Sequence, residues 1–127
     1  MRNVLILLLL ALSATQSQAQ LTRYIIQFTN KGQNTYSLSA PSSFLSAAAL
    51  ERRQRHNIAI DSTDLPVTAA YIDAVKATGA VTIINASKWL NSISIQTTDA
   101  AALEKIKALP FVKEATPIAS QQKLLAA

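Results

Sequence analysis

Residues able to support catalysis are few in this chain of 127 residues. It contains one histidine, His56, no cysteine, and seven aspartates and glutamates. A Ser-His-Asp triad needs an imidazole held between a nucleophile and a carboxylate, but His56 follows the arginine-rich stretch 52–55. The one local candidate for a metal site, His56 with Asp61 and Asp64, lacks the regular spacing of known ligand loops. The sequence therefore predicts no catalytic residue, no metal and no cofactor.

The basic residues do not form a pattern typical of nucleic-acid binding. Twelve lysines and arginines against seven acidic residues give a net charge of +5, but the lysines are spread along the whole chain. Nucleic-acid binders usually concentrate such charge in a stripe with aromatic residues. Only Arg52, Arg53 and Arg55 cluster. We interpret them as a solvated helix end, with contact to an acidic partner surface as the first alternative and a nucleic acid or membrane surface as the second.

The first residues have the layout of a secretory signal peptide. A basic start at residues 1–3 is followed by the apolar run 4–12 and by small residues at Ser17 and Ala19. This run is shorter than the roughly 20 residues of a membrane-spanning helix. We expect removal of residues 1–19 by cleavage after Ala19, a secreted or periplasmic location, and no stable membrane anchor after cleavage.

The elements that would position a binding site begin with a strand, a loop and a helix. Residues 23–29 alternate apolar and polar side chains, as a half-buried strand does. The polar stretch 30–40 is typical of a loop. Pro41 suits the first turn of a helix, which we expect over 42–57. Its apolar stripe would consist of Phe44, Leu45 and Ala48.

Two further helices are expected in the second half of the chain. One covers residues 68–78, begins with a threonine N-cap, and has Gly79 as a left-handed C-terminal cap. The other begins at Thr98, whose hydroxyl would cap free backbone donors, while the carboxylate of Asp99 suits the positive end of the helix dipole. Pro110 ends this helix.

Three short runs predict strands over 81–84, 90–97 and 111–116. The lone Trp89 is expected to pack in the core or at its rim. With helix 42–57 treated as an insertion after the first strand, the element order is β-α-β-β-α-β. This order predicts an α+β, ferredoxin-like fold, in which both crossover helices cover one face of a four-stranded antiparallel sheet. The other face of the sheet is then not covered by these helices.

Two stretches resemble the propeptides of subtilisin-like serine proteases. Residues 88–95 and 103–114 are similar to the end of a subtilase propeptide, where a strand, a short helix, a proline and a valine with an acidic residue follow one another. Shorter motifs upstream resemble the leader of exported subtilases of Bacteroidetes-type bacteria: 37–39, Pro41, 44–46, 49–53, 60–61 and 64–67. The likeness covers about residues 23–118. We therefore assign 20–118 to a propeptide-like domain and 119–127 to a C-terminal tail or linker.

The resemblance implies a propeptide that acts as a folding template and temporary inhibitor of a subtilisin-like catalytic domain. Such a propeptide lays its open sheet face on two helices of the protease and its C-terminal tail in the active-site cleft. The partner-binding residues would then be Ser92, Ser94, Gln96, Glu114, Lys123, Leu124, Leu125, Ala126 and Ala127. Many of these propeptides carry an acidic cluster after the last strand. Thr116, Pro117 and Ile118 occupy that place here, which leaves Glu114 as the nearby acid.

Two functions remain open from the sequence. The Asp, His and Ser motifs of a subtilase catalytic domain do not follow Ala127. We therefore expect a non-catalytic chain that is either part of a longer serine endopeptidase precursor or a free-standing inhibitor. The alternative is a free-standing secreted module of ferredoxin-like fold that binds an unrelated protein, because a fold does not fix a function.

Overall fold

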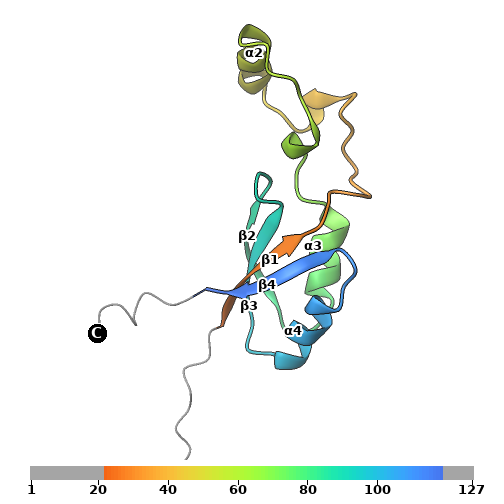
Figure 1. Ribbon diagram of the computed structural model, residues 1–127, viewed down its shortest axis with the longest axis vertical. Helices are drawn as coiled ribbons and strands as arrows, with labels where there is room; N and C mark the ends of the chain where they lie inside the picture. Colours follow the sequence, from red (N-terminus) through yellow and green to blue (C-terminus); the bar gives the residue numbers. More distant parts are fainter. Residues whose placement is uncertain (1–21, 119–127) are drawn as a thin grey trace, which may run out of the picture.

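The computed structural model describes residues 22–118. Four strands form one antiparallel sheet in the order β2-β3-β1-β4 (Figure 1). Their bounds are Arg23–Phe28 (β1), Thr82–Ser87 (β2), Ser92–Gln96 (β3) and Val112–Pro117 (β4). The first strand in the sequence is therefore central in the sheet, and the β2–β3 hairpin lies on one side of it.

Two helices, α3 (Ala69–Lys76) and α4 (Ala100–Lys107), pack on one face of the sheet (Figure 1). Each helix connects two strands, in the order β1-α3-β2 and β3-α4-β4. The predicted ferredoxin-like α+β class is thus confirmed. Within residues 22–118, no helix is long and apolar enough to cross a membrane.

The core lies between the helices and the sheet. Ile26 on β1, Ile93 and Ile95 on β3, Val75 on α3 and Ile106 on α4 are each at most 1% exposed. Burying one such side chain stabilises the fold by about 1.5–3 kcal/mol. The alternation that predicted β1 and β3 is thus the consequence of one apolar face turned toward the helices.

Aromatic rings close one end of this core. The rings of Tyr71 and Phe111 stack with their centroids 4.1 Å apart, and Phe28 lies tilted against both at 5.6 and 6.0 Å. The Tyr71 hydroxyl donates to Asn30 Oδ1 at 2.7 Å. This end of the core is where the chain leaves β1 for the long connection to α3.

That connection, residues 30–67, is named the insert here and extends beyond one end of the sheet (Figure 1). It contains two short 3₁₀ turns, η1 (Pro41–Ser43) and η2 (Ser62–Asp64), and the helix α2 (Ala47–Arg55). None of the α2 residues is buried. Helix α2 therefore does not add to the main core, to which the insert contributes Val67 at its end.

The helix of the insert is shorter than predicted. Pro41 begins a 3₁₀ turn instead of an α-helix, and α2 starts after Ser46, whose hydroxyl accepts a hydrogen bond from the Ala49 N–H. A serine at this position satisfies a free donor of the first turn. The proposed stripe is wrong in part, because Leu45 is buried ahead of α2 whereas Ala48 is exposed.

Two predicted helix caps also differ from the structure. Asp99, not Thr98, is the N-cap of α4, and its carboxylate accepts from the Ala102 N–H at 3.0 Å. The C-cap of α3 is Ala77, whose backbone is right-handed, so Gly79 is not a left-handed cap of this helix. Gly79 instead has a φ of +159° and lies against α4.

The β2–β3 hairpin is longer on its first strand than predicted. β2 continues to Ser87, three residues beyond the predicted end at Ile84, because the register shifts between Ile83 and Asn85 and pairing resumes after this bulge. A bulge interrupts the alternation without ending the strand. β3 begins at Ser92, two residues later than predicted.

Candidate protein-binding surfaces

The face of the sheet opposite α3 and α4 is the first candidate binding surface, named the open face here. Antiparallel partners point to the same face, so the register defines rows across the strands. The middle row places Asn85, Ser94, Ile25 and Thr116 side by side. One flanking row consists of Ser87, Ser92, Gln27 and Glu114, and the other of Thr82, Gln96 and Arg23.

The open face consists largely of small polar side chains around one isoleucine. Ile25 is 40% exposed at its centre. Small neighbours leave the backbone and this apolar side chain accessible to a partner. No helix of residues 22–118 lies over this face (Figure 1). An apolar centre with a polar surround is typical of a protein-binding surface.

The sequence-predicted partner residues on the strands do lie on one face. Gln96 and Glu114 are exposed, and Ser94 is half-buried in the middle row. Ser92 is only 5% exposed, so it offers little surface to a partner. The predicted residues Lys123, Leu124, Leu125, Ala126 and Ala127, like the predicted signal peptide 1–19, lie outside the described residues.

Sequence reasoning missed seven of the eleven members of the open face, among them Ile25 and Asn85 in its middle row. Ile25 was recognisable as the apolar residue on the polar side of the β1 alternation. Asn85 was not, because the β2 bulge moves it into the row of Ser94.

A second candidate surface lies where the insert meets the tip of the β2–β3 hairpin. Trp89 at this tip is 59% exposed and is not among the residues packed on the core, so the prediction that it packs in the core or at its rim is wrong. Its ring has the Lys88 ammonium 4.7 Å from the centroid and the Arg53 guanidinium carbon 6.0 Å from it. Cations at these distances are attracted by the ring face.

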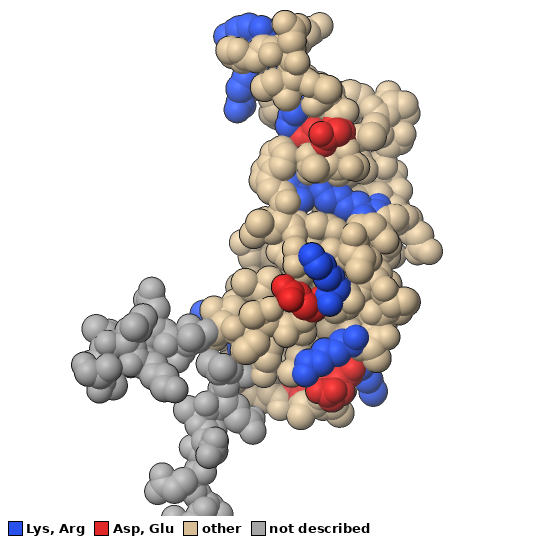
Figure 2. Space-filling model, viewed as in Figure 1, with Lys and Arg blue, Asp and Glu red and all other residues tan. Residues whose placement is uncertain are grey.

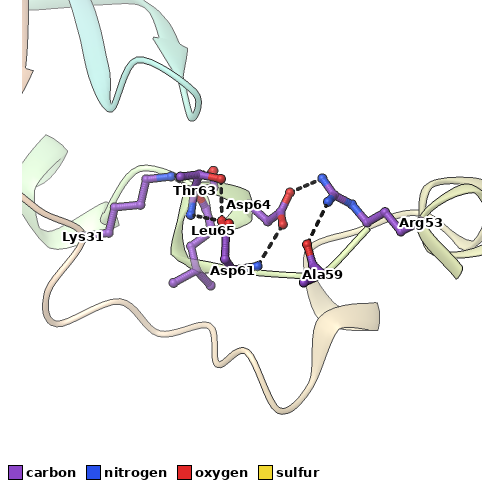
Figure 3. Close-up of polar contacts among 7 residues, drawn as sticks. All are labelled: Lys31, Arg53, Ala59, Asp61, Thr63, Asp64 and Leu65. Atoms are coloured by element: carbon purple, nitrogen blue, oxygen red, sulfur yellow. Dashed lines mark hydrogen bonds and ion pairs between the residues drawn. The ribbon is translucent and has the colours of Figure 1, made fainter. Parts of the chain in front are cut away.

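The carboxylates near this surface are engaged in the structure of the insert (Figure 3). Asp64 is 1% exposed, pairs with the Arg53 guanidinium, and accepts from the Asp61 N–H at 3.1 Å. Asp61 accepts from the Thr63 hydroxyl and N–H at 2.5 and 2.8 Å. Both bonds hold the pKa of Asp61 below its usual range, and the bond from the Thr63 hydroxyl has the larger effect.

Lys31 ties the start of the insert, just after β1, to its last part around η2. Its Nζ donates to the carbonyl oxygens of Thr63 and Leu65 at 2.9 and 2.5 Å (Figure 3). Burial lowers the pKa of Lys31, and the nearby Lys88 lowers it further. Two cations therefore approach each other at this junction.

The candidate metal cluster of the sequence does not form a site in the described part of the chain. Asp61 and Asp64 hold a capping box around η2, and His56 is exposed at the end of α2. Within residues 22–118, no group of three or more histidine, cysteine, aspartate or glutamate side chains is arranged to hold a metal ion. The proximity of these three residues therefore follows from their places in the capping box and at the end of α2.

The four-stranded antiparallel sheet with two helices on one face defines an α+β domain of the ferredoxin-like class. Comparison with protein families gives its identity. The model of the Peptidase S8 propeptide domain, Bacteroidota, matches residues 23–126, and the chain belongs to this family. The matched segment is a non-catalytic region of an S8 protease. Neither a curated protein nor a solved structure matches the chain.

Proposed function

We propose that this domain is a folding template and a temporary inhibitor for the catalytic domain of an S8 protease. The observation that carries the proposal is the open face, which in a member of a propeptide family has Ile25 exposed among small polar residues. A catalytic domain that covers this face would bury an apolar centre that is left in water in the free domain. Binding of this kind stabilises both partners by mass action.

Inhibition would come from the segment after β4. The Ile118 N–H donates to the Arg23 carbonyl at 2.8 Å, so the sheet pairing continues to Ile118. Residues beyond this point could add an extended strand to a substrate cleft through backbone hydrogen bonds. The family match also reaches residue 126 and so includes most of this segment. Export by a signal peptide at 1–19 belongs to the same proposal, and the intact mass of the exported chain tests it.

Separate variants test binding and inhibition against the cognate S8 catalytic domain. Deletion of residues 119–127 should abolish competitive inhibition and leave residual binding, because the sheet pairing is untouched. Ser94→Arg should weaken binding by about tenfold or more, since it places a long charged side chain in the middle row of the open face.

The matched control is Ala101→Arg, which adds the same side chain at an exposed site on α4, on the other side of the sheet. This variant should bind as the unmodified domain does. Equal weakening by both arginines, or unchanged inhibition after the deletion, would refute the proposed binding mode.

A further inference from the structure

The junction of the insert with the hairpin tip contains a groove of about 520 Å³. Leu45, Ala49 and Ile58 line it from the insert, and Lys88 and Trp89 line it from the hairpin. A neighbouring hollow of about 510 Å³ shares Lys88 and Trp89 and reaches the end of β1. We name the first of these the junction groove.

The apolar part of the junction groove is exposed to an extent that a folded domain usually avoids. Ile58 is 51% exposed and Trp89 is 59% exposed, and Leu90 next to Trp89 is 66% exposed. Exposed apolar residues gathered at one place mark interaction sites more often than isolated ones do. Tryptophan in particular is enriched among the residues that dominate binding energies.

The charge of the junction groove is positive. Arg52 makes no ion pair within the described residues, and Lys88 is likewise without an acidic partner there. Its lining contains three cations, Arg52, Arg53 and Lys88, against the two carboxylates Asp61 and Asp64. Asp64 pairs with Arg53, whereas Asp61 keeps its charge and accepts hydrogen bonds from Thr63. Figure 2 shows Lys and Arg atoms between the upper lobe and the sheet domain, with Asp or Glu atoms just above them. Such a surface attracts carboxylates.

Residues 1–21 and 119–127 contain no acidic side chain. Residues 119–127 contain one charged residue, Lys123, and residues 1–21 contain one, Arg2. Both have the sign of the groove itself. Neither segment therefore contains an acidic side chain that could pair with the groove.

The junction groove and the open face share the β2–β3 hairpin, the groove at its turn and the open face along its strands. Trp89 lies in the hairpin turn three residues before Ser92, so the two are separated by at most about 10 Å of chain. A protein docked over Ser94 and Ile25 would therefore lie close to the hairpin tip. The sheet and the groove could contact one partner simultaneously.

We propose that the junction groove binds an acidic surface segment of the cognate S8 catalytic domain, one that places an aliphatic or aromatic side chain against Trp89. The inference rests on the proposed function and adds a second contact to it. Arg52 and Lys88 pair with the carboxylates of the segment, and Ile58 and Trp89 cover its apolar side chain. The insert thus helps the domain to select its partner, because complementary charge contributes to specificity.

The first experiment measures binding of charge-reversed domains to the cognate catalytic domain, with its nucleophilic serine replaced by alanine to prevent cleavage. The double variant Arg52→Glu/Lys88→Glu should weaken binding by about tenfold to a hundredfold and reduce its salt dependence. Arg52→Glu alone should have part of this effect, and it is not expected to disturb folding because Arg52 is exposed. Lys105→Glu, a reversal at an exposed site on α4, is the matched control and should leave affinity unchanged.

The second experiment reads the groove directly. Trp89 is the only tryptophan of the chain, so 5-fluorotryptophan labelling gives one ¹⁹F resonance from this site. Addition of unlabelled catalytic domain should shift or broaden this resonance. The shift should be smaller with Arg52→Glu/Lys88→Glu at the same fraction bound.

The outcomes separate this inference from the proposed function. If the unmodified domain inhibits the protease but the groove variants bind equally well and the ¹⁹F resonance does not move, the groove contact is refuted and the function stands. If the unmodified domain does not bind the protease, both fail. A ¹⁹F shift caused by deleting 119–127 without protease, or a concentration-dependent shift of the free domain, would assign the groove to the tail or to a second copy and overturn the inference.

Discussion

Asp64 shows how a single buried carboxylate can organise a segment that has little core. It is 1% exposed and joins the Arg53 side chain of α2 to the backbone of the η2 turn. Arg53 is itself only 17% exposed, so its charge depends on this partner. Removal of one member of a partly buried pair leaves the other uncompensated.

We predict that Asp64→Asn destabilises the domain by about 2–3 kcal/mol, because Arg53 loses its counter-charge while still partly buried. Urea denaturation followed by circular dichroism measures this. The control is Glu51→Gln, which breaks the Arg55–Glu51 pair, in which both side chains are 68% exposed. That loss should stay below about 0.5 kcal/mol. Similar losses for the two variants would show that the burial of Asp64 has no energetic consequence.

The connection between α3 and β2 illustrates packing between elements. A Cβ added to Gly79 would lie 2.5 Å from the Asp99 carboxylate and 2.9 Å from the Ala102 Cβ, at a φ of +159°. Both neighbours belong to the first turn of α4, which Asp99 caps. The missing side chain therefore permits the close approach of the connection to this helix.

Gly79→Ala should destabilise the domain by about 1–3 kcal/mol, because it forces the start of α4 to move. Thermal unfolding provides the measurement. Gly32→Ala is the comparison, since its Cβ would meet the Asn30 Oδ1 and Tyr71 Oη only at 3.1 Å. The Gly32 variant should lose clearly less stability, and the opposite order would contradict this account of Gly79.

The molecule as a whole should lose stability in acid. Hydrogen bonds from the Thr63 hydroxyl hold the pKa of Asp61 below its usual range, and those from the N–H groups of Ala102 and Ala80 do the same for Asp99. Their folded pKa values lie below the unfolded value of about 3.9. The stabilisation is therefore present above the unfolded pKa and is lost as the pH falls through the folded pKa. A chain with a net charge of +5 also gains further self-repulsion in acid.

We expect the urea midpoint to be nearly constant above about pH 5 and to fall below about pH 4. Asp99→Asn should flatten this fall, since asparagine keeps a capping oxygen but does not titrate. Asp73→Asn removes an exposed carboxylate with no hydrogen-bond partner among the described residues and serves as the control. An unchanged acid slope for Asp99→Asn would refute the assignment.

The sequence by itself determined the elements of the sheet domain and its family. Ile26 and Phe28 lie on the buried side of β1, and Val75 and Ile106 lie on the apolar faces of their helices. Such periodicity is local, because each side chain of a regular element faces a direction set by its neighbours in the chain. The element order then restricted the topology to few arrangements, and the structure confirms the ferredoxin-like one.

The tertiary structure decided what surrounds the insert. Lys31 reaches the carbonyls of Thr63 and Leu65 across more than thirty residues, and Arg53 meets Asp64 across eleven. Trp89 is exposed because the hairpin tip extends toward the insert instead of lying under a helix. No local period encodes these contacts, since they depend on the path of an irregular chain through space. The open face followed from side-chain alternation, whereas the junction groove exists only because two distant segments meet.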